Sequence, residues 1–247
     1  VPTPTPPLPT FAPAPPDAVY HLPDQYSTGY KGEFSGLQDI VEKYPKLKYS
    51  DYYKEVKITQ ALSDYYGGYF ENFKITGGYT LKIVANCVTV NNFYIDAEGC
   101  YYGINTSGSH VLIENGEIVH GGSAQIYTEN GETLIRNMNL HDGPSDGIKP
   151  NGNTRVEGTY IHSLGMGSPE AHADCVQMVK NGNYEFYGNR FDFPALPGYA
   201  YSNSAFITSV KDPNVIDGIT VRKNWLNGGS NNTNIGNAPR IINVTFT

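Results

Sequence analysis

Two short segments of this chain place an aspartate in the same setting. The segment SDGIKP holds Asp146 and, three residues later, Lys149; the segment ADCVQM holds Asp174 and, at the same spacing, Gln177. Two carboxylates held side by side could bind a divalent cation such as Ca²⁺, share one proton, or form the close pair of a retaining glycosidase. The two aspartates are therefore the first candidate catalytic residues, with calcium as their candidate metal.

Histidines and further polar residues surround these segments. His172 lies two residues before Asp174 in an expected loop, where neither a core nor a turn requires an imidazole. A lysine or histidine beside a cation-bound uronate could also act as the base that abstracts a proton in a polysaccharide lyase. The candidate catalytic set is Asp146, Asp174, His172, Lys149 and His162. The candidate substrate-binding set is Gln177, Glu170, Asp142, Tyr199 and Tyr201.

Tyrosine is the second chemical signal, with 20 residues in the chain. A flat ring with a polar tip suits a sugar, which it can stack on and hydrogen-bond. Tyr199 and Tyr201 lie in an expected long loop and are the better glycan candidates. The early pairs are expected to pack locally or against a partner; they are Tyr52-Tyr53, Tyr65-Tyr66 and Tyr101-Tyr102.

A structural role is the alternative for the aspartates. An aspartate before glycine often closes a turn by bonding its own backbone, and both Asp146-Gly147 and Asp217-Gly218 have this sequence. For His110 and His120, an ordinary place at the surface or at the edge of a coil is the expected role. The two interpretations of Asp146 predict different hydrogen-bond partners for its carboxylate.

These candidates can meet only if segments far apart in sequence become neighbours. Six segments share apolar third and eighth positions: VTVNNFYI, VLIENGEI, TLIRNMNL, TRVEGTYI, YEFYGNRF and ITVRKNWL. Their fifth position is Asn or Gly, and Lys in the last. Consecutive third positions, such as Val90 and Ile113, are 21 to 35 residues apart. A β-rich repeat of this length is typical of a parallel β-solenoid.

The repeat predicts an all-β, right-handed parallel β-helix. Asn and Gly tolerate the left-handed backbone of a tight corner, so the fifth position is expected to bend the strand. In this fold Asp146 lies under Asp174 and Lys149 under Gln177, about 4.8 Å apart. A sandwich of antiparallel hairpins is the alternative, but its turns are more closely spaced. A second apolar column is expected at Ile104, Ile126, Ile148, Val176, Phe206 and Ile235.

The chain divides into three expected regions. Residues 1–19 form a proline-rich arm or linker, residues 20–55 a cap with a short helix, and residues 56–247 the β-helix. The cap helix is expected to begin at a capping box from Ser35 to Gln38 and to cover the first coil. The last coil is expected to lack a cap of its own; truncation after Thr247 is the favoured explanation, and a subunit that covers this end is the alternative.

Composition limits the partners. With 17 basic and 24 acidic residues the net charge is −7, which discourages non-specific binding to nucleic acid. No stretch is long and apolar enough for a membrane span. Cys87, Cys100 and Cys175 are expected to be small buried hydrophobic residues. The expected partners are a polysaccharide and the protein subunits of a larger assembly, with a homo-oligomer as one option.

SDGI and ADCV resemble the aspartate motifs of the polygalacturonase family, in the pectate-lyase-like superfamily of right-handed parallel β-helices. The second motif of that family has two adjacent aspartates, where this chain has Ala173-Asp174. The family's downstream histidine motif and Arg-x-Lys motif are absent from this sequence. Pectic hydrolysis by that mechanism is therefore not expected.

SDGIKP, YIHSLG, HADCVQM, GNRFD and NWLNGG, over roughly residues 143–229, are similar to segments of β-helix proteins of the bacteriophage minor-tail or tail-surface type and of related bacterial exported proteins. The resemblance implies an extracellular or virion-surface component that meets host polysaccharide, and it brings no catalytic set. The leading hypothesis is a structural, carbohydrate-recognising β-helix on an external assembly. The alternative is a polysaccharide lyase or glycoside hydrolase acting on acidic polysaccharide.

Overall fold

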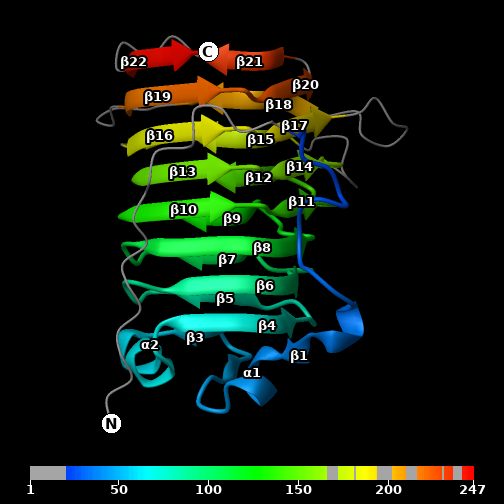
Figure 1. Ribbon diagram of the computed structural model, residues 1–247, viewed down its shortest axis with the longest axis vertical. Helices are drawn as coiled ribbons and strands as arrows, with labels where there is room; N and C mark the ends of the chain where they lie inside the picture. The colour runs from blue at the N-terminus through cyan, green and yellow to red at the C-terminus, as the bar shows by residue number, and fades with distance from the viewer. Residues whose placement is uncertain are drawn as a thin grey trace.

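The computed structural model describes residues 21–165, 172–180, 182–193, 202–209, 216–229, 231–235 and 241–247. Strands of this part of the chain stack as successive rungs of a parallel β-helix, which confirms the predicted fold class (Figure 1). A 13-stranded sheet, sheet A, and a nine-stranded sheet, sheet B, form its walls. The predicted proline-rich arm lies outside the described residues.

Sheet A contains long early strands and divided later ones. Its first strands are β1 (Gln38–Asp39), β4 (Tyr69–Ile75), β6 (Thr89–Asp96) and β8 (Val111–Val119). Later rungs divide at a corner into two strands. The pairs are β10 (Glu132–Arg136) with β11 (Asn139–His141), β13 (Asn153–Glu157) with β14 (Tyr160–His162), β16 (Gly182–Tyr187) with β17 (Arg190–Phe193), and β19 (Ile216–Arg222) with β20 (Trp225–Gly228). The last strand of the sheet is β22 (Ile241–Phe246).

The fifth position of the repeat forms this corner, as predicted. The φ angle lies between 51° and 67° at Asn92, Asn115, Asn137, Gly158, Gly188 and Lys223. The asparagines also bond along the ladder: Asn92 Nδ2 donates to Asn72 Oδ1 at 2.6 Å, and Asn137 Nδ2 to Asn115 Oδ1 at 3.3 Å. Asn72 has the same φ, 51°, and β4 pairs along its length with β6. The repeated corner and its pairing are therefore already present at β4.

Sheet B forms the opposite wall. Its strands are β2 (Tyr49–Ser50), β3 (Glu55–Ile58), β5 (Thr80–Ile83), β7 (Tyr102–Thr106), β9 (Ala124–Thr128), β12 (Asp146–Lys149), β15 (Ala173–Met178), β18 (Ser202–Thr208) and β21 (Asn231–Ile235). The predicted apolar column holds from Ile104 to Phe206. Its last member is wrong, because Thr233 lies beside Phe206 and Ile235 beside Thr208. Backbone register, not side-chain type, sets the alignment of this polar last strand.

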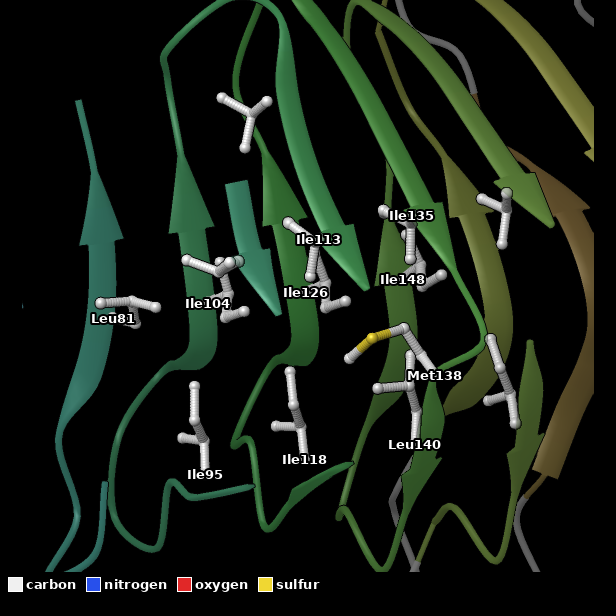
Figure 2. Close-up of a cluster of buried hydrophobic side chains, with 14 of the residues drawn as sticks. Leu81, Ile95, Ile104, Ile113, Ile118, Ile126, Ile135, Met138, Leu140 and Ile148 are labelled. Carbon is white, nitrogen blue, oxygen red and sulfur yellow. The ribbon is translucent and has the colours of Figure 1, made fainter. Parts of the chain in front are cut away.

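Inward-facing side chains of both sheets fill the coil. Figure 2 shows Ile95, Ile118 and Leu140 on successive rungs, with Ile104 and Ile126 across the interior. All five are fully buried. Cys100 and Cys175 are buried and free, as predicted, whereas Cys87 is only partly buried. Stacking of like side chains on successive rungs therefore supplies one continuous core.

The N-terminal cap differs in detail from the prediction. Its helix α1 (Ile40–Lys43) begins after Asp39, whose Oδ1 accepts the Val41 N–H at 2.9 Å. The predicted start at Ser35 is wrong, because residues Phe34–Gly36 form a 3₁₀ turn, η1, and Gln38 belongs to β1. Asp39 therefore caps the helix, whereas the preceding 3₁₀ turn has no side-chain cap. The apolar side chains Ile40, Tyr44 and Leu47 are buried against the first rungs.

Two further segments complete the structure. A second helix, α2 (Gln60–Tyr66), was not predicted; Thr59 caps its start and Gly67, with φ 73°, its end. Residues 21–37, the N-terminal strap, run across successive rungs of sheet A (Figure 1). The Gly29 N–H donates to Asn137 O at 2.9 Å, and the Phe34 ring meets Tyr94 at 5.1 Å. No helix in the described residues has the length and apolar character that crossing a membrane requires.

Candidate functional site

The two candidate aspartates lie on neighbouring strands of sheet B. Ile148 pairs with Val176, so Asp146 lies beside Asp174, the predicted stacking. The Asp174 N–H donates to Asp146 Oδ1 at 2.8 Å. Their side chains are only 2% and 0% exposed. Lys149 lies beside Gln177 in the same register.

Each aspartate is held by polar neighbours. Lys149 Nζ lies 3.0 Å from Asp146 Oδ2. Asn203 Nδ2 donates to Asp174 Oδ1 at 2.9 Å, and Gln177 Nε2 lies 3.4 Å from Asp174 Oδ2. Asp146 therefore bonds the next rung and a lysine, which contradicts the alternative that it closes a turn in its own backbone.

Burial raises the pKa of both aspartates, which makes them weaker acids than usual. Burial, followed by the charge of Asp146, raises the pKa of Asp174 to about 7, although the Asn203 hydrogen bond opposes the shift. Burial also raises the pKa of Asp146, and the Lys149 ammonium opposes that change. A carboxyl group that keeps its proton near neutral pH has the property required of a general acid.

His172 is the accessible member of this group. Its side chain is 66% exposed, and its Nδ1 lies 3.9 Å from Asp174 Oδ2. An imidazole at this distance could exchange protons with the carboxyl group through one water molecule. The geometry thus brings four of the five candidate catalytic residues together: Asp146, Asp174, His172 and Lys149.

The donor set does not fit calcium. Ca²⁺ takes six to eight oxygen ligands. Both oxygens of Asp146 and both of Asp174 already face nitrogen donors. Within the described ranges, no group of three His, Cys, Asp or Glu side chains is arranged to hold a metal ion.

The fifth candidate, His162, belongs to a separate histidine cluster on sheet A. Its ring stacks on Tyr160 at 4.1 Å and on His141 at 4.9 Å, and its Nε2 lies 3.1 Å from Asn139 Oδ1. Asp142 is in the same cluster, with Oδ2 2.8 Å from His141 Nδ1. These contacts place His162 and Asp142 with each other and not with the aspartate pair.

The two stacked histidines titrate in opposite directions. Burial, followed by the neighbouring His141, lowers the pKa of His162 to about 4. Burial also works against protonation of His141, but its hydrogen bonds to Glu117 and Asp142 outweigh that effect and raise its pKa. One ring of the stack therefore favours the neutral form and the other the charged form.

Three candidate substrate-binding residues, Glu170, Tyr199 and Tyr201, lie outside the described residues. Of the other two, Gln177 contacts the aspartate pair and Asp142 the histidine cluster. The predicted glycan-binding loop therefore remains a prediction.

A tyrosine-lined hollow opens on the outer face of sheet B. This tyrosine recess has a volume of about 340 Å³ and includes Tyr53, Tyr101, Tyr102, Lys82 and Asn105 in its lining. Tyr53 is 68% and Tyr101 71% exposed. The sequence predicts that these rings pack locally or against a partner. They do pack in pairs, with Tyr101 and Tyr102 at 5.2 Å, yet they leave much of their surface open.

The next rungs continue this aromatic and polar surface. Tyr102 stacks on Tyr127 of β9 with ring centroids 4.6 Å apart and planes 9° apart. Lys180 Nζ donates to the Tyr127 hydroxyl at 3.1 Å. Tyr127 lies beside Lys149, which contacts Asp146. The recess and the aspartate pair therefore share one face of the solenoid. A signal was present in the sequence, because Asn105, Tyr127, Lys149 and Gln177 occupy the same column.

Sheet A carries another hollow, of about 410 Å³, between Arg155, Glu185 and Arg222. Arg155 forms ion pairs with Glu157 and Glu185 on the same and the next rung. The glutamates of the sheet therefore neutralise the charge of Arg155. This hollow lies apart from the predicted catalytic groups.

Comparisons of the chain with protein-family models, with curated proteins and with solved structures found no match. The resemblance to tail-surface and exported proteins therefore stays a prediction. The two stacked parallel sheets establish the β-helical fold.

Proposed function

We propose that this protein is a structural, carbohydrate-recognising β-helix of an external assembly, and that sheet B presents its glycan-binding face. The observation that carries the proposal is the tyrosine recess. Open tyrosine rings beside Lys82 and Asn105 combine stacking surfaces with hydrogen-bonding groups. Sugar rings need both kinds of contact, because each has apolar C–H faces and a rim of hydroxyl groups.

Two details favour a glycan over a protein partner at this face. The recess is concave, whereas tyrosines at a protein interface need no hollow. The recess lining also includes Thr80 and Asn105, polar side chains that can hydrogen-bond sugar hydroxyls.

The external location has a different support. It rests on the resemblance of residues 143–229 to tail-surface and exported β-helix proteins. Size-exclusion chromatography with light scattering tests the assembly, and a glycan array tests the recognition. A stable monomer that binds no glycan would contradict both parts.

The recess is tested by substitution. Tyr101→Ala should weaken binding of the best array glycan by up to about tenfold, since a stacked aromatic contact contributes about 0.5–1.5 kcal/mol. The matched control is Tyr65→Ala, because Tyr65 is also exposed but lies on α2. Unchanged affinity in Tyr101→Ala, measured by calorimetry, would place the glycan elsewhere.

An enzyme acting on acidic polysaccharide, as a lyase or glycoside hydrolase, is the second candidate. The observation in its favour is Asp174, with a pKa raised by burial to about 7 beside the accessible His172. Because Asp174 is buried, its proton would reach the leaving glycosidic oxygen through the exposed His172. The ionised Asp174 would then take back, through His172, the proton released by the substrate or by the attacking water, while the Lys149 ammonium holds Asp146 in place.

A turnover screen on uronate polymers tests this candidate, with unsaturated products and new reducing ends as its two readouts. Asp174→Asn should reduce the rate by about 10²-fold or more, the usual contribution of a general acid. Asp64→Asn, a change at an exposed carboxylate on α2, is the control. No turnover on any polymer, or full activity in Asp174→Asn, would remove the candidate.

A further inference from the structure

A second hollow adjoins the tyrosine recess at the edge where the chain passes from sheet A to sheet B. This corner hollow has a volume of about 480 Å³ and is lined by Tyr101, His120, Gly122 and Pro144, among others. These residues lie in the turns after three successive rungs of sheet A, which end with β6, β8 and β11. The hollow therefore extends along the solenoid axis.

Three consecutive residues line both hollows. Tyr101 lines both the tyrosine recess and the corner hollow, and it is 71% exposed. Gly99 and Cys100 also line both. A ligand leaving the recess past the Tyr101 ring thus enters the corner hollow without crossing a flat part of the sheet.

The combined path crosses several rungs. The recess reaches down to Lys54 and Glu55 at the start of β3, and the corner hollow reaches up to Pro144, just before β12. The order β3-β5-β7-β9-β12 in sheet B makes this four steps. At about 4.8 Å a step, the path is roughly 19 Å long, which suits several linked sugars and exceeds one.

Cations along the path are neutralised by carboxylates. The two lysines that line the path are paired, Lys54 with Asp51 at 3.7 Å and Lys82 with Glu129 at 2.6 Å. The whole chain carries a net charge of −7. An acidic polysaccharide would therefore find no excess positive charge to attract it. The affinity of a neutral glycan does not depend on such a charge.

We infer that the tyrosine recess and the corner hollow are consecutive subsites of one groove, which holds a neutral polysaccharide along the solenoid axis with Tyr101 between the subsites. This inference rests on the proposed carbohydrate recognition and adds the direction, the length and the charge class of the ligand. A longer oligosaccharide then gains affinity by filling both subsites.

Calorimetry with ladders of cello-, malto- and manno-oligosaccharides, from disaccharide to hexasaccharide, tests the inference, with oligogalacturonates as acidic probes. In the ladder that binds, the hexasaccharide should bind about tenfold more tightly than the disaccharide, the gain expected from one further stacked sugar. Oligogalacturonates should bind more weakly than neutral chains of equal length.

Two variants separate the subsites. His120→Asn removes the ring from the corner hollow at a φ of 62°, a conformation that asparagine tolerates. It should reduce the hexasaccharide affinity toward that of the disaccharide and leave the disaccharide unchanged. Tyr101→Ala should weaken both ligands.

The outcomes distinguish this inference from the proposed function. If no oligosaccharide of any ladder binds, carbohydrate recognition itself fails and the groove with it. If disaccharide and hexasaccharide bind equally and His120→Asn changes neither, recognition stands and the two-subsite groove is wrong. Tighter binding of oligogalacturonates than of neutral chains would overturn the charge class.

Discussion

At Asp174, burial and the neighbouring carboxylate act in the same direction. Both disfavour the charged form and raise the pKa from its ordinary value of 3.8 to about 7. Between these two values the folded protein binds more protons than the unfolded chain, so its stability falls as pH rises. Ionised Asp174 is therefore a cost of the folded state at neutral pH, a pattern found often at functional sites.

Replacing this carboxyl should remove the cost. Asp174→Asn should be more stable than the parent at pH 8, by at most about 4 kcal/mol for three pKa units, and should lose less stability between pH 4 and 7. Urea unfolding at several pH values measures this. The control Asp64→Asn should show no such change, since Asp64 is exposed. Greater instability of Asp174→Asn at pH 8 would contradict the prediction.

His162 should produce the opposite pH dependence. Burial and His141 lower its pKa to about 4 from 6.5, so the unfolded chain binds more protons between these values. Stability is then lost as pH falls from about 6.5 toward 4, by at most about 3 kcal/mol. His162→Gln should reduce this acid sensitivity in urea unfolding. An unchanged acid slope would show that the stacked ring is not the cause.

At the scale of elements, the corner of sheet A could be predicted from its Asn and Gly residues. The aromatic packing inside that corner could not. Phe73 and Phe93 stack inside neighbouring rungs with centroids 5.3 Å apart, and Gly116 lies beside Phe93 on the next rung. A Cβ at Gly116 would clash with the Phe93 ring, at 2.3–2.6 Å from three of its atoms. The glycine is needed here for space and not for backbone conformation.

Gly116→Ala should therefore destabilise the protein by about 1–3 kcal/mol or more, the usual cost of overpacking a core. Chemical unfolding measures the change. The matched control is Gly36→Ala, where an added Cβ would meet nothing within 4 Å. Equal stability of the two variants would show that the aromatic stack adjusts freely.

The helix α2 is an element whose local sequence did not distinguish a helix from a turn. Its residues Gln60–Tyr66 lie between two strands and contain only one buried residue, Ser63. Leu62 and Tyr66, four residues apart on one face, pack against the core, but seven residues are too few for the apolar period to identify a helix. The cap Thr59 and the left-handed Gly67 were readable in sequence, but each also suits a turn.

For the whole molecule, a solenoid distributes stability by neighbour contacts. Each inner rung pairs on two sides, whereas β20, β21 and β22 each pair with one strand among the described residues. Trp225, Ile235 and Phe246 are 52%, 37% and 47% exposed on these strands. At the other end, α1 and the residues after it are packed against the first rungs.

This asymmetry predicts a gradient of amide hydrogen exchange. Amides of β20–β22 should exchange through openings about 2 kcal/mol or more below those of β6, β8 and β10, because rungs stabilise one another mainly through adjacent contacts. The capped rung of β4 is the internal comparison and should exchange slowly. Uniform protection along the axis would indicate one cooperative unit.

The sequence alone determined the coil, its corner and the register of the aspartates. These follow from local properties: tolerance of positive φ at Asn and Gly, and apolar side chains repeated at one inward position. Only the tertiary structure decided that Asp174 is buried, that His162 lies apart from it, and that Tyr101 separates two hollows. Burial, pKa and concavity arise from turns of different rungs brought together, and no single repeat contains that information.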